Sequence, residues 1–170
     1  MLWPRLAKNL VARPLTDPAP ATRPEEVAEL SAMLEVSARR RLGRSLALRA
    51  VDAGSCNGCE LELNATQNVV HDLERFGLRF VASPRHADVL LITGPVSLNM
   101  RDALERTWQA IPEPKWAVAV GDCATCGGLF AASPACAGGA AAVVPITLTI
   151  PGCPPSPTAL LKGLIALLAG

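Results

Sequence analysis

The residues of this chain most able to do chemistry are its cysteines. Cys56 and Cys59 stand three positions apart in DAGSCNGCELEL, Cys123 lies in GDCATCGG and Cys153 lies in PGCPPSP. Thiols in such settings can pair with each other, bind zinc, hold an iron–sulfur cluster or take no part in chemistry. Which of the four possibilities applies depends on where the helices and strands of the chain place these thiols.

Composition sets the first limits on function. The chain has 170 residues, enough for one domain with a substantial core. Half of its residues are hydrophobic but only 4% are aromatic, so aliphatic residues must build the core, and part of the apolar surface is expected to face a partner. The net charge of +1 provides no electrostatic basis for binding nucleic acid.

The apolar runs are too short to cross a membrane, and the start MLWPRLAKNLVARPL has no continuous hydrophobic region of the secretory type. We therefore expect a cytoplasmic protein. Thiols stay reduced in the cytoplasm, so six cysteines favour metal or redox use over structural disulfides.

Three segments are expected along the chain. Residues 1–24 contain five prolines and predict an extended arm, which is either a tail in solution or a strip that lies along a partner or membrane surface. Residues 25–44 predict an amphipathic helix with a linker, with Val27, Leu30 and Leu34 on one face. Residues 45–170 form the principal domain, in which strands and helices alternate.

This alternation predicts an α/β protein with a doubly wound, mainly parallel sheet of five strands, a flavodoxin-like three-layer fold. Strands are expected at 45–51, 78–83, 87–94, 115–121 and 143–150, with helices at 60–77, 96–111 and 156–170.

The four cysteines named above follow the first, fourth and fifth of these strands. Loops at the carboxyl ends of parallel strands emerge at one edge of the sheet, so distant cysteines can become neighbours there. Four thiolates satisfy either a cubane iron–sulfur cluster or a tetrahedral zinc ion. Glycines and prolines beside the cysteines fit sharp turns close to the sulfurs, although ordinary turns also use these residues.

Four sequence blocks then define a resemblance. DAGSCNGCELE, SPRHADVLLITGPV, GDCA with a following GG, and IPGCPPSP occur in an order and spacing similar to the small electron-transfer subunit shared by group 4 NiFe hydrogenases and complex I, the NADH-quinone oxidoreductase. The resemblance runs from about residue 46 to the end of the chain. The CxxC spacing resembles formate hydrogenlyase-type, energy-converting hydrogenases, because the 20 kDa subunit of complex I carries two adjacent cysteines there.

The resemblance implies that four cysteine ligands bind one 4Fe-4S cluster. The same four residues then form both the cofactor-binding site and the metal site. These are Cys56, Cys59, Cys123 and Cys153. It also implies a large catalytic subunit, NiFe hydrogenase-like or quinone-reducing, a ferredoxin-like iron–sulfur subunit and membrane subunits as partners, with no nucleic acid. The chain would then be the iron–sulfur subunit of an oxidoreductase complex, peripheral on the inner face of the cell membrane, with no catalytic residues of its own.

Other readings of the residues stay open at this point. A structural zinc domain and a thiol–disulfide enzyme are the alternatives to electron transfer, and passage of electrons to quinone is the alternative to hydrogenase activity. Cys126 and Cys136 match no ligand position. Cys126 forms a second CxxC with Cys123 and is either an alternative iron ligand or a small buried hydrophobe, whereas Cys136 is expected to be inert. Glu60 either relays protons or faces a partner, or it is an acid in the first turn of a helix. Glu62 is expected to be such a first-turn acid. Asp122 either binds a partner or caps a turn. His71 and His86 are expected at the surface.

The stretch before the last cysteine departs from the family pattern. Thr147 and Leu148 stand where the family usually carries an acid and a tyrosine. The loop AASPACAGGAAA consists mostly of Ala and Gly, a simpler composition than is usual there. These differences concern contacts between subunits rather than the cysteine positions.

Overall fold

A computed structural model describes residues 24–169 and contains a five-stranded sheet in the order β2-β1-β3-β4-β5. Every neighbouring pair of strands is parallel. This strand order is that of flavodoxin-like proteins, so the predicted fold class is confirmed. The strands are β1 (Leu46–Asp52), β2 (Leu78–Phe80), β3 (Val89–Thr93), β4 (Trp116–Val120) and β5 (Leu148–Ile150).

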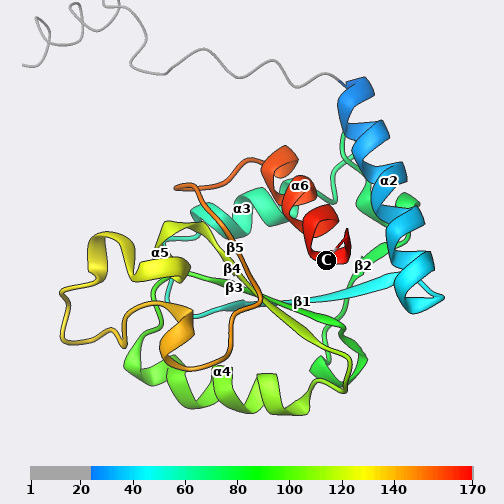
Figure 1. Ribbon diagram of the computed structural model, residues 1–170. Coiled ribbons are helices and arrows are strands. Elements are labelled where there is room, and N and C mark those ends of the chain that lie inside the picture. The colour runs from blue at the N-terminus through cyan, green and yellow to red at the C-terminus, as the bar shows by residue number, and fades with distance from the viewer. Residues whose placement is uncertain (1–23, 170) are drawn as a thin grey trace, which may run out of the picture.

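Helices cover both faces of this sheet (Figure 1). They are α2 (Pro24–Leu42), α3 (Gly58–Ala65), α4 (Leu98–Ala110), α5 (Gly121–Cys126) and α6 (Pro157–Ala169). Single 3₁₀ turns connect them at η1 (Leu73–Phe76), η2 (Pro84–His86), η3 (Gly128–Phe130) and η4 (Ala140–Ala142). None of the helices in the described part of the chain is both long and apolar enough to span a membrane.

The period-two alternation of the central strands divides the core into two layers. In β3, Val89 and Leu91 face the layer that contains α2, α3 and α6, whereas Leu90 and Ile92 face the layer that contains α4 and α5. All four side chains are almost completely buried, as expected for a parallel sheet covered on both sides. The continuous apolar run predicted as a buried strand is therefore covered by helices on each face.

Helix α2 belongs to the first of these layers. Val27 and Leu34 are buried and Leu30 packs against the same cluster, so the predicted apolar face of this helix is confirmed. The helix packs along α6, which begins with Pro157 in its first turn. The arm predicted for residues 1–24 lies outside the described residues except for Pro24, which opens α2.

The helix predicted over residues 60–77 is wrong in its second half. Helix α3 ends at Ala65 because the Asn68 side chain competes with the helix for the backbone amides that follow. The Asn68 side-chain oxygen accepts hydrogen bonds from the amides of Val70 and His71, at 2.9 and 3.0 Å. Asp72 then adopts a left-handed conformation, and only the single turn η1 follows before Gly77.

Two further differences concern the segments around Cys123 and before β5. Cys123, expected in a loop, lies in the short helix α5. The strand expected from residue 143 begins only at Leu148. Pro145 has no amide hydrogen with which to continue a ladder to β4, so pairing starts after it.

Candidate functional site

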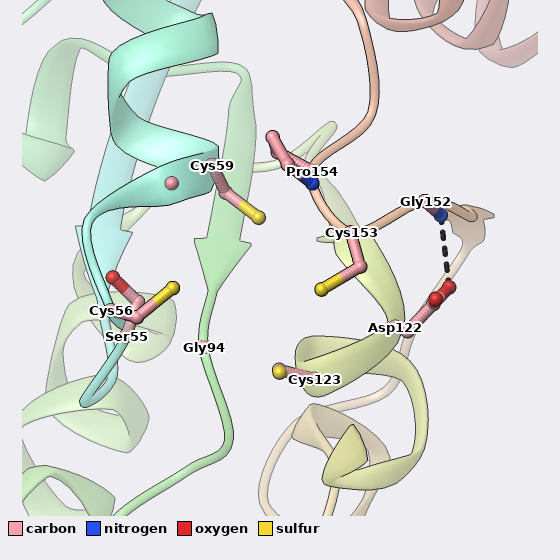
Figure 2. A pocket seen from close by; sticks show the side chains of 10 residues that line it. Ser55, Cys56, Cys59, Gly94, Asp122, Cys123, Gly152, Cys153 and Pro154 are labelled. Atoms are coloured by element: carbon pink, nitrogen blue, oxygen red, sulfur yellow. Dashed lines mark hydrogen bonds between the residues drawn. The ribbon is translucent and has the colours of Figure 1, made fainter. Parts of the chain in front are cut away.

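Four cysteines from three separate segments line one cavity of about 100 Å³ at the carboxyl edge of the sheet. We call it the cysteine pocket; its lining residues are Ser55, Cys56, Gly58, Cys59, Gly94, Asp122, Cys123, Gly152, Cys153 and Pro154. The four sulfur atoms point into the same space (Figure 2). The thiols surround a volume instead of meeting at a point, and no three His, Cys, Asp or Glu side chains within residues 24–169 are grouped for a single metal ion.

The loop that carries Cys56 is shaped by polar side chains at the end of β1. The Asp52 carboxylate accepts hydrogen bonds from the amides of Gly54 and Ser55, at 2.8 and 2.7 Å. The Ser55 hydroxyl accepts from the amide of Asn57 at 2.9 Å, and Asn57 has a left-handed φ of 70°. These turns direct the chain back into α3, whose first turn contains Cys59.

Glycines allow backbone and sulfur to approach closely. A Cβ added at Gly121 would lie 2.7 Å from the Cys59 sulfur, and one at Gly128 would lie 2.7 Å from the Cys123 sulfur. Both glycines also have a positive φ, which strains other residues. At Gly94 a Cβ would lie 2.5 Å from the Ser55 amide nitrogen, so the turn after β3 closes against the Cys56 loop.

The ends of β4 and β5 are tied together by a reciprocal pair of hydrogen bonds. The Asp122 amide donates to the Gly152 carbonyl and the Gly152 amide donates to the Asp122 carboxylate, both at 2.9 Å. The second bond is the dashed line in Figure 2. Asp122 therefore fixes the spacing between Cys123 and Cys153, which is closer to the predicted turn-capping role than to a partner-binding one.

The electrostatics of the pocket favour binding of a positively charged group. Burial raises the pKa of the Cys59 thiol to about 11, and the charges of Glu60 and the other three pocket thiols contribute to that rise. Burial also raises the pKa of Cys123, assisted by Cys153 and Cys56 and opposed by a hydrogen bond from the Leu129 amide. Since each thiolate disfavours the others, all four become anionic together only when a cationic group compensates them.

The remaining cysteines do not line this pocket. Cys126 is exposed, and its thiol donates to the Asp122 carbonyl at 3.3 Å, along its own helix. Cys136 lies in an isolated bridge with Ser97. Cys126 is therefore not the small buried hydrophobe that was one of its two expected roles, and the exclusion of both cysteines from the ligand set stays a prediction.

Other sequence candidates divide between the site rim and the core. Glu60 accepts a hydrogen bond from the Ser55 hydroxyl at 2.6 Å, while its second oxygen is buried without a hydrogen-bond partner among the described residues. His86 is exposed, as expected. The expectation of a surface position for His71 is wrong: it is 8% exposed, because the turn at Asn68 folds it inward and its Nδ1 lies 3.1 Å from the Asn68 side-chain oxygen.

Two contributors to the site were not singled out from the sequence. Ser55 joins the turn at Asn57 to Glu60, and Gly128 makes room for the Cys123 sulfur. The GG pair that follows CATC carries a signal for the second, since paired glycines after a cysteine indicate close backbone approach. A single serine in a loop carries no comparable signal.

A family model described as "NADH ubiquinone oxidoreductase, 20 Kd subunit" matches residues 56–167, which is more than half of the chain. The chain belongs to this family. The match begins at the first pocket cysteine and includes all four. Membership implies an iron–sulfur cluster, and the apolar, glycine-lined cysteine pocket fits such a group.

Relatives of the chain include subunits of several oxidoreductases. It is 43% identical over 96% of its length to formate hydrogenlyase subunit 7 of Escherichia coli, of which it covers 60%. It is 41% identical over 75% of its length to a probable membrane-bound hydrogenase subunit (mbhJ) of Pyrococcus furiosus, of which it covers 76%. It is 46% identical over 64% of its length to a subunit of the NADH-quinone oxidoreductase of Desulfovibrio desulfuricans, of which it covers 59%.

A solved structure gives the same picture. The chain is similar, with a TM-score of 0.66 and 29% identity, to a chain of the membrane-bound sulfane sulfur reductase, an archaeal respiratory membrane complex. The match covers 81% of this protein and 74% of that chain. Its family members are thus subunits of oxidoreductase complexes, and its homologues occur in multi-subunit complexes of membranes. The chain spans about three fifths of the length of the Escherichia coli relative.

Proposed function

We propose that this protein is an electron-transfer subunit that carries one 4Fe-4S cluster beside the active site of a large catalytic subunit. The ligands are the sulfurs of Cys56, Cys59, Cys123 and Cys153. The single observation that carries the proposal is the meeting of these sulfurs in one cavity. A bound cluster supplies one-electron transfer at a potential set by its surroundings.

The surroundings of the sulfurs are suited to that role. The amide of Leu129 donates to the Cys123 sulfur, and such donors stabilise thiolate ligands. Gly121 and Gly128 bring backbone against the Cys59 and Cys123 sulfurs, so that no side chain blocks the space beside these two sulfurs. The chain itself holds and orients the group.

An exposed apolar rim beside the cysteine pocket supports docking of the large subunit there. Leu129 lines a second hollow together with Cys123 and Cys153 and is 93% exposed. Phe130 next to it is 47% exposed. Large apolar side chains at such exposures favour burial by another protein, and a partner seated on this rim would come within electron-transfer reach of the cluster.

The complex is of the NiFe hydrogenase or formate hydrogenlyase type, bound to the cytoplasmic face of a membrane with ferredoxin-like and membrane subunits. The CxxC spacing of Cys56 and Cys59 and the identity to hydrogenase subunits support this branch. The second candidate is a quinone-reducing complex, supported by the identity to the NADH-quinone oxidoreductase of Desulfovibrio desulfuricans. The large subunit separates them: CxxC pairs near both of its ends support nickel, and their absence excludes it.

Anaerobic purification tests the cluster assignment directly. The expected protein is brown, contains about four irons per chain and gives an EPR signal when reduced. Colourless protein with intact cysteines after reconstitution with iron and sulfide would refute the assignment. Stoichiometric zinc in place of iron would favour the structural zinc domain, and insulin reduction by iron-free protein would favour a thiol–disulfide enzyme.

A further inference from the structure

The edge of the sheet opposite the cysteine pocket carries a second concavity of about 270 Å³. We call it the arginine pocket; its lining residues are Arg44, Arg79, Arg85, His86, Ala87 and Pro112. These residues come from the segments that lead into β1, β3 and β4 and from β2 itself. The topology therefore gathers three guanidinium groups and an imidazole at the amino ends of parallel strands.

One of the guanidinium groups is held in place by the protein. Arg44 donates through Nη1 and Nη2 to the two Asp88 carboxylate oxygens, at 2.9 and 2.5 Å. Asp88 is 2% exposed and also accepts from the Ala47 amide at 2.9 Å. These bonds use two of the five N–H groups of Arg44, so three remain for another acceptor.

The other two guanidinium groups have no such neutralising partner. Within residues 24–169, neither Arg79 nor Arg85 makes an ion pair or a side-chain hydrogen bond, and both are exposed. No carboxylate lines the arginine pocket. Like charges placed around one hollow repel each other unless an anion is bound between them.

We propose that the arginine pocket binds a phosphate group, carried by an anionic lipid headgroup or present as free phosphate. The guanidinium fork donates two parallel hydrogen bonds to oxyanions, and a tetrahedral phosphate can accept from three sides at once. A carboxylate has two oxygens in one plane and matches guanidinium groups that come from three separate segments less well. The pocket shares no residue with the cysteine pocket, so this assignment is independent of the cluster.

The test uses the full chain and a double variant, R79Q/R85Q. The matched control is R101Q/R106Q, which removes the same charge from exposed positions of α4 outside the pocket. Calorimetric titration with inorganic phosphate at constant ionic strength should give equal affinities for the wild type and the control. The double variant should bind on the order of 100-fold more weakly, about tenfold for each guanidinium contact removed. Circular dichroism and iron content should be the same for all three proteins.

Vesicle flotation identifies the source of the phosphate. Binding to phosphatidylglycerol vesicles but not to phosphatidylcholine vesicles, competed by inorganic phosphate and lost in R79Q/R85Q, assigns a lipid headgroup. Phosphate binding without vesicle binding assigns free phosphate, and both results support the pocket. Absence of phosphate binding by the wild type at millimolar concentration, equal loss in the control, or unchanged binding in R79Q/R85Q would overturn the proposal. An acidic peptide that binds where phosphate does not would assign the pocket to a protein partner, against our inference.

Discussion

The two ends of the parallel sheet bring distant residues together by different means. At the carboxyl edge, backbone conformation does the positioning: glycines with positive φ and amide hydrogen bonds direct short cysteine side chains into one cavity. At the amino edge, long arginine side chains reach a shared hollow, and a buried carboxylate fixes one of them. The first edge should therefore be sensitive to added atoms near the backbone, and the second to changes of charge.

The largest effect is expected from removing a pocket cysteine. Cys123→Ser should abolish the cluster, because an alcohol, which stays protonated and binds iron weakly, replaces one of the four proposed thiolate ligands. Iron content and visible absorbance of the anaerobically purified protein measure the loss. The control is Cys126→Ser in the same helix, which should keep its iron because Cys126 does not line the pocket. Equal loss in both variants would disprove our choice of ligands.

A methyl group at Gly121 should have the next largest effect. Its Cβ would lie 2.7 Å from the Cys59 sulfur, and its φ of 85° is unfavourable for alanine, so Gly121→Ala should lower iron occupancy several-fold. Strain alone should cost about 1–3 kcal/mol of unfolding free energy. Gly138→Ala separates the two effects, because Gly138 has a φ of 96° and no atom within 4 Å of an added Cβ.

Both glycine variants should thus lose stability in chemical denaturation, while only Gly121→Ala loses iron. An iron content in Gly121→Ala equal to that of Gly138→Ala would mean that the carboxyl edge tolerates added atoms, and the comparison between the two edges would break down.

At the amino edge, Asp88→Asn should destabilise the fold without affecting the cluster. The change removes the charge that anchors Arg44 and weakens the acceptor for the Ala47 amide. The expected loss of unfolding free energy is about 1–3 kcal/mol, at the lower end because Arg44 is half exposed. Denaturation of the reduced, iron-free protein measures it. Glu35→Gln, which removes an exposed pair with Arg39 on α2, should cost less than about 0.5 kcal/mol.

The smallest effect sharpens the electrostatic description of the cysteine pocket. Below pH 11 the Cys59 thiol of iron-free folded protein stays mostly protonated, because burial raises its pKa from 9.0 to about 11. Alkylation by iodoacetamide should therefore accelerate about tenfold per pH unit between pH 8 and 10. At pH 8 the unfolded chain should react on the order of 100-fold faster at this position, as measured by mass spectrometry. Equal rates in the folded and unfolded chains would show that burial does not control this thiol.

Much of the fold could be predicted because its signals are local. The apolar run at Val89–Thr93 and the alternation of strands with helices suffice for a buried parallel sheet, and the structure confirms both. The end of α3 could not be predicted from hydrophobic periodicity, since it depends on one side-chain oxygen of Asn68 that captures two backbone amides. The same turn buries His71, which the sequence suggested to be exposed.

The site followed from topology more than from any motif. Once strands precede Cys56, Cys123 and Cys153, a parallel sheet brings these residues to one edge, and the structure places them around one cavity. Their role as cluster ligands stays a prediction, as does the division of the chain into arm, helix and domain. The hydrogen bonds of Asp122 and Ser55 were beyond sequence reasoning, because they depend on how separate loops approach each other.

The order of the pocket cysteines along the chain has a consequence for biogenesis. Cys56 follows the first strand and Cys153 follows the last, so the cysteine pocket is incomplete until β5 has taken its place beside β4. During synthesis from the N-terminus, the set of four sulfurs is incomplete until β5 and Cys153 have been translated. Under the proposed assignment, iron and sulfide must accordingly be inserted after β5 has joined the sheet, so the machinery that delivers them has to act on an assembled five-stranded sheet rather than on a nascent fragment that ends before β5.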